Sequence, residues 1–457
     1  MACCDDFTRT ERRRAAASTA ARAGRGLPAI EPGMPLPAGT GLTRRDVLVR
    51  SAGLALSVYG ADRLGFQALE AGIAEAAAAP AQPVLISIFL PGGIDSLSVL
   101  APTGDPAYST TLRPTLRLDE AGTLPVSGRT DLRWHPGAAA LKALHDAGKV
   151  GIAPAIGYAS PNQSHFTSRH FWEVGELDIA GRTGWMGRYL DLVGQPNNPI
   201  QGLSLDSQLS PSLATAAVSV SAASSPASYA FASPNVSTQA IKDGMLDAFG
   251  RLGGLPTSDP VLAQARQAQA NADGLRRQLA TPVAPGSATY PASNTLAGRL
   301  RSLAGLLGAG LPIRCVTVNA NGGYDTHSAQ APALETNLRT TCEAVAAFQA
   351  DLEARGAALA DRVLIHLWSE FGRRPRENGS SGTDHGAAGT SFVVGTRSSG
   401  QAIGEFPGLA TLDTGGNLRS TSDFRAVYCS LLEQWLGVDA AAVIPGAAGF
   451  ARPVLVR

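Results

Sequence analysis

Short apolar runs, each followed at once by polar and glycine-rich residues, recur along the chain. The clearest cover residues 83–90, 314–318 and 363–368, and further runs cover residues 150–156 and 391–394. Continuous apolar runs of this length, bounded by turn residues, predict buried strands. We therefore expect a sheet built largely from buried strands.

Helical patterns separate these runs. Leu296, Leu300, Leu303 and Leu307 follow a spacing that predicts an amphipathic helix over residues 295–307. Further helices are predicted over residues 133–147, where the helix opens near Pro136, and over residues 167–175, 333–359 and 421–436. This alternation of strands and helices predicts an α/β fold with parallel strands joined by right-handed crossovers.

The middle of the chain differs in composition. Residues 200–293 are rich in Ser, Ala and Pro, with a helical run at 261–279 and a Pro/Ser/Gly linker at 281–293. No internal repeat is visible, and no motif in this stretch indicates a chemical function. We interpret residues 200–293 as a helical and irregular insert or cap region, a kind of segment that often sets specificity.

The N-terminal segment resembles an export signal. Residues 1–40 are rich in Arg, Ala, Gly and Pro, and we expect them to be disordered. Arg44 and Arg45 precede a modestly apolar stretch, and small residues at 74–80 offer cleavage sites, as in a twin-arginine signal. We favour residues 1–80 as leader and export signal for the twin-arginine translocation machinery, and residues 81–457 as a periplasmic or secreted domain. The alternative is an amphipathic helix that stays attached.

Composition narrows the classes of partner. The chain has 457 residues, 44% of them hydrophobic, and a net charge of +1, which suits a large α/β domain and gives no sign of nucleic-acid binding. Arg50 and Asp62 interrupt the apolar stretch of the signal, and no later apolar run is long enough to span a bilayer, so no transmembrane segment is expected in the mature chain. Cys315, Cys342 and Cys429 are predicted to be buried thiols, with a disulfide between two of them as the alternative.

Acidic residues and histidines follow three of the predicted strands. In chain order they are Asp95, Asp325 with His327, and Asp384 with His385. Parallel strands would bring these side chains to one edge of the sheet, where repulsion between carboxylates favours a bound cation. We therefore predict a divalent metal site, for zinc or a similar ion, with these five residues as ligands. The alternative is structural, with turn-forming or helix-capping aspartates and solvated histidines.

Two further pairs of residues complete the candidate site. Ser164 and His165 lie where the strand at 150–156 leads into a helix, near backbone N–H groups that stabilise an anion. The alternative for Ser164 is that it only caps the helix. Glu370 and Arg373 follow the strand at 363–368 as candidate substrate contacts, because Arg suits phosphate or sulfate. Each of the two has an ordinary ion pair as its alternative.

A set of motifs, specific only in combination, resembles a known family. The motifs are FLPGGIDSLSVLAP, IGYASPNQSHFTSRHFWEVGE, GRTGWMGRYL, NGGYDTHSAQ, SEFGRRPREN with GTDHG, and TSDFRAVYCSLLEQWLG. In this order they resemble the domain-of-unknown-function 1501 (DUF1501) family of exported bacterial proteins, related to the alkaline phosphatase/sulfatase superfamily. The resemblance implies an alkaline-phosphatase-like, three-layer α/β/α sandwich with a mostly parallel central sheet. It also implies a catalytic Ser or Thr at a strand-to-helix junction, here Ser164 beside His165, or Thr167.

This resemblance leads to a functional hypothesis. It favours an exported metal-dependent hydrolase of phosphate or sulfate esters, in which the cation lowers the pKa of the nucleophile. Two-metal members of the superfamily use a further histidine downstream, and none follows His385, so one metal or none fits this chain better. The alternative is an exported binding or assembly protein that keeps the fold without full catalysis.

Overall fold

The computed structural model describes residues 56–59, 82–195, 198–224, 238–259, 262–263, 266 and 286–457. These residues fall into two compact units. The first comprises the described residues within Met1–Gln82, Arg182–Pro285 and Gly305–Val316, and the second comprises Pro83–Gly181, Gly286–Ala304 and Thr317–Arg457. Most of the predicted leader, including Arg44 and Arg45, lies outside the described residues.

The second unit is built on a mixed sheet. Along the sheet its strands are β9 (Cys315–Asn319, in this unit from Thr317), β2 (Val84–Phe89), β10 (Val363–Trp368), β13 (Gly389–Val394), β6 (Val150–Gly157) and β14 (Ser422–Asp423). β10 is parallel to β2 and β14 is parallel to β6, whereas β13 is antiparallel to both β10 and β6. The prediction of an α/β fold with a mostly parallel sheet is therefore confirmed. β13 runs opposite to β2, β10, β6 and β14.

The central strands are buried on both faces. β2 and β10 pair in register from Val84–Val363 to Phe89–Trp368, and every residue of the two strands is buried. Strands covered on both faces need apolar side chains at consecutive positions, which is the pattern that predicted them. The same reasoning explains β6, whose residues are also buried throughout.

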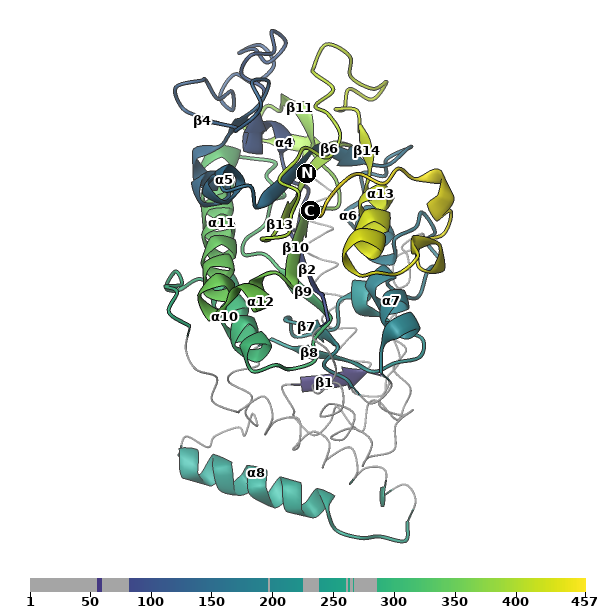
Figure 1. The fold of residues 1–457 in the computed structure, drawn as a ribbon. Coiled ribbons are helices and arrows are strands. Elements are labelled where there is room, and N and C mark those ends of the chain that lie inside the picture. Colours follow the sequence, from purple (N-terminus) through teal and green to yellow (C-terminus); the bar gives the residue numbers. More distant parts are fainter. Residues whose placement is uncertain are drawn as a thin grey trace. The chain divides into compact units, whose positions relative to one another are not determined.

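Helices cover both faces of this sheet in the second unit (Figure 1). α5 (Ala139–Asp146) and α11 (Gln330–Arg355) lie on one side, and α6 (His165–Val174) and α13 (Phe424–Ser430) lie on the other. On the α6 side, Trp172 stacks on Trp368 of β10 with ring centroids 5.3 Å apart and on Phe424 with centroids 4.5 Å apart. The second unit thus has the three layers that were expected.

The remaining elements of the second unit are short. They are α4 (Ser96–Val99), α12 (Ala357–Ala360), the β3–β5–β4 sheet (Leu100–Ala101, Arg133–Trp134, Leu124–Pro125), the β11–β12 hairpin (Arg373–Glu377, Thr383–His385), and α10 (Thr295–Gly308), which belongs to this unit up to Ala304. Short 3-10 turns cover Pro136–Ala138, Ala440–Ala442 and Ala447–Gly449, and a π-helical turn covers Leu431–Trp435.

Some predicted helix limits were wrong. The helix expected over residues 133–147 begins at Ala139, because β5 takes the first two positions and Pro136 starts a 3-10 turn. His135 precedes that turn, and its Nδ1 accepts a hydrogen bond from the Gly137 N–H at 2.9 Å. Capping by a side chain at this point separates the turn from the preceding strand.

The first unit contains β1 (Leu56–Tyr59), β8 (Val220–Ala223) and β7 (Gly202–Ser204). β8 is antiparallel to β1 and parallel to β7. The helices of the first unit include α7 (Trp185–Val193) and α8 (Gln239–Gly253), and a 3-10 turn covers Pro211–Leu213. β1 falls in the stretch predicted as the apolar part of the export signal, and most of the helix predicted over residues 261–279 lies outside the described residues.

Two further predictions concern cysteines and membrane spans. Cys315, Cys342 and Cys429 are buried free thiols, as predicted. Burial raises the pKa of Cys342 to about 12, so this thiol stays protonated and unreactive. Across the part of the chain that the structure describes, no helix is long and apolar enough to cross a membrane.

Candidate metal centre

The candidate residues come from loops and short elements at the ends of the strands of the second unit. Asp325 and His327 follow β9, Glu370 follows β10, and His385 ends β12. His165 is the first residue of α6, which follows β6. The ends of strands in an α/β sheet are where such folds place ligands, because the loops there converge on one edge.

The carboxylate of Asp325 is the point on which three imidazoles converge. Its Oδ1 lies 3.5 Å from Nε2 of His165, 3.1 Å from Nε2 of His327 and 3.3 Å from Nε2 of His385. Nε2 of His327 is also 2.9 Å from Nε2 of His385. The ligand atoms of His165, Asp325 and His385 all lie within 4.8 Å of one another, close enough to share one metal ion.

The Nδ1 atom of each of these imidazoles lies within hydrogen-bond distance of an oxygen atom that can accept. Nδ1 of His165 faces Oε1 of Glu370 at 2.7 Å, Nδ1 of His385 faces the carbonyl oxygen of Gln163 at 2.9 Å, and Nδ1 of His327 faces Oδ1 of Asp384 at 3.2 Å. Because carbonyl and carboxylate oxygens only accept, each Nδ1 must donate.

The assignment of the three Nδ1 atoms as donors sets the charge that is required around Oδ1 of Asp325. A neutral imidazole carries one N–H, so three donating Nδ1 atoms leave three Nε2 lone pairs directed at the Asp325 carboxylate. Lone pairs and a carboxylate oxygen at about 3 Å repel one another unless a positive charge lies among them. The Arg373 guanidinium, which donates to the same Oδ1, a proton on an imidazole or a metal cation can supply that charge. Three nitrogens with one oxygen form a donor set typical of zinc and similar ions.

The charge states of Asp325 and His385 agree with metal binding. Burial raises the pKa of Asp325, but the nearby positive charge of Arg373 lowers it, so the carboxylate is ionised. Burial lowers the pKa of His385, so its ring is neutral near pH 7. An ionised carboxylate and a neutral imidazole are the forms that bind a metal.

Glu370 orients His165 and is not at an open surface. Its carboxylate is buried and accepts hydrogen bonds from the N–H groups of Gly92 at 3.0 Å and Gly93 at 3.1 Å. Burial raises the pKa of Glu370, but the hydrogen bonds from His165 and Ser369 lower it more, so Glu370 is ionised. The structure therefore places this predicted substrate contact behind the histidine.

Arg373, the other predicted substrate contact, is also buried against protein atoms. Its Nε donates to the carbonyl oxygen of Gly93 at 2.9 Å and its Nη1 to that of Thr383 at 2.8 Å. Its Nη2 donates to Gly92 O and to Oδ1 of Asp325. Arg373 thus ties the loop after β2 to Asp325 and to β12, and its position fits orientation of a ligand better than contact with a substrate.

Asp95 is engaged elsewhere. Its carboxylate forms a buried ion pair with Arg113, with Nη1–Oδ2 at 2.7 Å and Nη2–Oδ1 at 2.9 Å. Asp95 also caps α4 by accepting from the N–H of Leu97 at 3.2 Å. We therefore leave Asp95 out of the ligand set and keep the histidines and Asp325, with Asp384 behind His327.

Ser164 takes the N-cap position of α6, but its side chain forms no capping hydrogen bond. Its own N–H donates to Oδ1 of Asn162 at 2.8 Å. The simple capping interpretation of Ser164 therefore lacks its hydrogen bond, while His165 beside it lies among the imidazoles. The sequence did not indicate His165 as a candidate ligand and predicted it only as a catalytic partner of Ser164.

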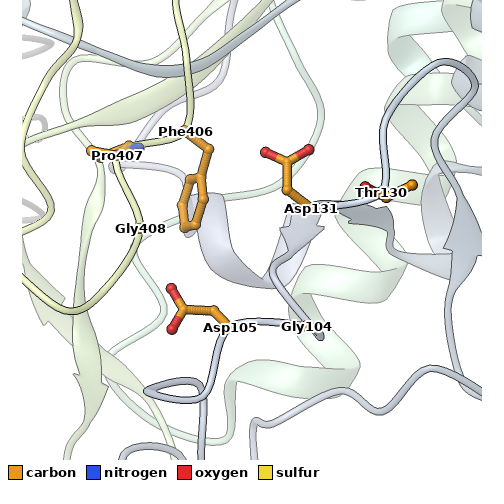
Figure 2. Close-up of a pocket in the computed structure, with 7 residues that line it drawn as sticks. All are labelled: Gly104, Asp105, Thr130, Asp131, Phe406, Pro407 and Gly408. Atoms are coloured by element: carbon orange, nitrogen blue, oxygen red, sulfur yellow. The ribbon is translucent and has the colours of Figure 1, made fainter.

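A separate hollow of about 420 Å³ lies among loops of the second unit (Figure 2). Its lining consists of Gly104, Asp105, Thr130, Asp131, Phe406, Pro407 and Gly408, and includes none of the candidate ligands. The Asp105 carboxylate accepts from the N–H groups of Ala107 and Leu409, and Asp131 pairs with Arg129. These acidic groups therefore hold loops together.

Comparisons with known proteins place the chain in a family. Among solved structures, the chain is similar to the crystal structure of the PsFucS1 sulfatase from Pseudoalteromonas sp., at 10% sequence identity and a TM-score of 0.32. The match covers 91% of this chain and 78% of the sulfatase chain. No curated protein matches. Residues 155–447, more than half of the sequence, match the profile described as "Protein of unknown function (DUF1501)", and the chain therefore belongs to the DUF1501 family.

Proposed function

We propose that this protein is an exported metal-dependent hydrolase of phosphate or sulfate esters. The observation that carries the proposal is the convergence of three imidazole Nε2 atoms on the ionised carboxylate of Asp325. Every one of these imidazoles has an acceptor at its Nδ1, which is the usual outer-shell arrangement of metal-bound histidines.

The donor set favours a zinc-like divalent ion over magnesium or calcium, which prefer oxygen ligands. Such an ion supplies positive charge that polarises an ester oxygen and lowers the pKa of a nucleophile. His165, His327, His385 and Asp325 would hold it. A single ion suits the site, because Asp95 is paired with Arg113 and supplies no ligand for a second.

The residues around the ligands have distinct roles in the proposal. Glu370 and Asp384 hold the Nδ1–H of His165 and His327, which keeps both Nε2 atoms available as ligands. Ser164, at the N-terminus of α6, is the proposed nucleophile or anion contact, because the partial positive charge of a helix N-terminus favours an anion.

One observation favours the non-catalytic alternative. Glu370 and Arg373 are buried, so the residues expected to contact an ester are turned to the protein. Under this alternative the chain is an exported binding or assembly protein that uses the metal for structure.

Elemental analysis followed by an ester screen tests the two functions. The parent protein, purified after export by its native pathway, is compared with the Asp384→Ala/His385→Ala double variant. We expect a stoichiometric divalent metal in the first and its loss in the second, together with loss of phosphate or sulfate ester hydrolysis. Metal without hydrolysis would support the binding protein, and no metal in either sample would refute the metal site.

Export is tested separately with the full chain. Replacing Arg44 and Arg45 by lysine should retain the protein in the cytoplasm if the twin-arginine machinery recognises them. Unchanged localisation would refute this part of the proposal without touching the metal site.

A further inference from the structure

We propose that Gln330 is a positioning residue that sets the distance between the two loop segments that carry the metal ligands. The inference rests on the proposed metal site. The segments are residues 325–327 after β9 and residues 383–385 of β12, and Gln330 is the first residue of α11. The side-chain hydrogen bonds of Gln330 go to Thr326, Thr383, Asp95 and Ser98, so its effect on the candidate ligands is indirect.

A single side-chain oxygen joins the two segments. Oε1 of the fully buried Gln330 accepts from Oγ1 of Thr326 at 2.9 Å and from Oγ1 of Thr383 at 2.6 Å. Thr326 lies between Asp325 and His327, and Thr383 directly precedes Asp384 and His385. Moving either threonine therefore moves a candidate ligand within two residues of it, Asp325 or His327 beside Thr326 and His385 after Thr383.

The orientation of this amide is decided by a buried charge. Nε2 of Gln330 donates to Oδ2 of Asp95 and to Oγ of Ser98, the latter at 3.2 Å. Turning the amide over would place its oxygen against the Asp95 carboxylate, which would repel it. Asp95, predicted as a ligand, thus acts on the site through Gln330.

The ion pair of Asp95 extends the support to β11. Arg113 is fully buried, and besides Asp95 it donates from Nε to the carbonyl oxygen of Pro375 at 2.7 Å. Pro375 lies in β11, which pairs with β12. The strand that carries His385 is therefore anchored from both its neighbour and Gln330.

Backbone contacts close the same joint. The N–H of Thr383 donates to the carbonyl oxygen of Thr326 at 3.1 Å, and the N–H of Gln330 donates to that of Ser381 at 2.9 Å. Alongside these backbone hydrogen bonds, the Gln330 amide holds the two threonine side chains together. The proposed positioning role predicts that this contact maintains the 2.9 Å approach of His327 to His385.

The test compares Gln330→Met with Gln349→Met in the full-length protein. Gln349 is a matched control, because it is buried in the same helix and its Nε2 donates to Glu353 at 2.8 Å, away from the ligand segments. Metal affinity is measured by titrating Co²⁺ into metal-free protein and following its visible absorption. Thermal unfolding of the metal-free protein is measured in parallel.

We expect Gln330→Met to weaken Co²⁺ binding by about tenfold or more, the usual effect of losing outer-shell support, and to change the shape of the Co²⁺ spectrum. Gln349→Met should leave affinity and spectrum as in the parent protein, even where it lowers the unfolding temperature as much. Equal losses of affinity in both variants would overturn the inference, because they would reflect general destabilisation.

A crystal structure of Gln330→Met separates this inference from the proposed function. If the parent protein binds no Co²⁺, the proposed function fails. The positioning role is then supported if the His327–His385 approach is lost in the variant. It is overturned if that approach stays at its parent distance, whether or not metal binds.

Discussion

Nδ1 of His165 lies 2.7 Å from Oε1 of Glu370, although 205 residues separate the two along the chain. Both side chains are buried. The carboxylate is held in turn by the N–H groups of Gly92 and Gly93. A backbone turn, a carboxylate and an imidazole therefore form one chain of hydrogen bonds that directs Nε2 of His165 at Asp325.

Glu370→Gln should weaken metal binding by about 10- to 100-fold, as outer-shell substitutions commonly do. The amide can still accept from Gly92, but its NH₂ group would face Nδ1 of His165. The imidazole would then carry its proton on Nε2 and lose the lone pair that faces the metal. Isothermal titration with Zn²⁺ measures the change.

The control for this substitution is Glu353→Gln. Glu353 accepts from Lys149 at 2.7 Å on a partly exposed surface, so its loss removes a carboxylate without touching the site. We expect its Zn²⁺ affinity to equal that of the parent protein. Equal affinities for Glu370→Gln and Glu353→Gln would contradict the orienting role of Glu370.

Gly92→Ala should destabilise the protein and displace Asp325. Gly92 has a φ of 115°, and a Cβ at this position would collide with the backbone nitrogen of Asp325. The strained conformation costs of order 1–3 kcal/mol for a residue with a side chain, so the free energy of unfolding should fall by about 2 kcal/mol or more.

Gly323→Ala is the matched control for this prediction. Gly323 lies in the loop that carries Asp325, and a Cβ there would meet nothing within 4 Å. Its unfolding free energy should change by no more than about 0.5 kcal/mol, as at other open surface positions. Urea unfolding of both variants gives the comparison, and similar losses would show that Gly92 has no special place in the site.

The sheet could be predicted from the sequence because burial on both faces leaves a direct record. The run at 363–368 matches β10 residue for residue, since a strand buried on both faces favours apolar side chains, and His366 is the exception within it. Asp325, His327 and His385 could be named because they follow strand ends, where parallel strands converge. Local order along the chain was sufficient for both inferences.

Other parts of the site depend on contacts between distant segments. Asp95 follows a Gly-Gly turn as Asp325 does, but Arg113 from a loop without a predicted element neutralises it. Glu370 and Arg373 have the residue types of substrate contacts, yet the fold turns them inward. His165 joins the candidate ligands because its imidazole lies against Asp325 from the loop after β9 and Glu370 from the loop after β10, which no local pattern records.

Ser164→Ala separates nucleophilic catalysis from helix capping. If Ser164 is the nucleophile, ester hydrolysis should fall by about a thousandfold or more while the metal content stays the same. Because its hydroxyl makes no capping hydrogen bond, the unfolding free energy should change by less than about 0.5 kcal/mol.

Thr167→Ala serves as the control in α6 and as a test of the other hydroxyl in this turn. It should leave hydrolysis as in the parent protein if Ser164 is the nucleophile. Full activity in Ser164→Ala with loss in Thr167→Ala would reassign the role, and full activity in both would favour direct attack by water.

His366 makes the stability of the second unit depend on pH. It lies in β10, fully buried, with its ring edge-on to Tyr428 at 5.9 Å between centroids, and burial lowers its pKa from 6.5 to about 3. The His366 side chain is therefore protonated below about pH 6.5 in the unfolded chain, but only below about pH 3 in the folded chain. The contribution to stability is complete above pH 6.5 and is lost as the pH falls.

His366→Leu removes this titration while keeping an apolar side chain in the strand. At pH 5 the unfolded histidine lies about 1.5 pH units below its pKa, so the parent protein should lose about 2 kcal/mol relative to pH 7.5 that the variant keeps. Urea unfolding at the two pH values measures this difference, and the other titrating groups cancel because both proteins share them. An identical loss in parent and variant would mean that His366 is protonated or solvated in the folded protein, contrary to its position inside the sheet.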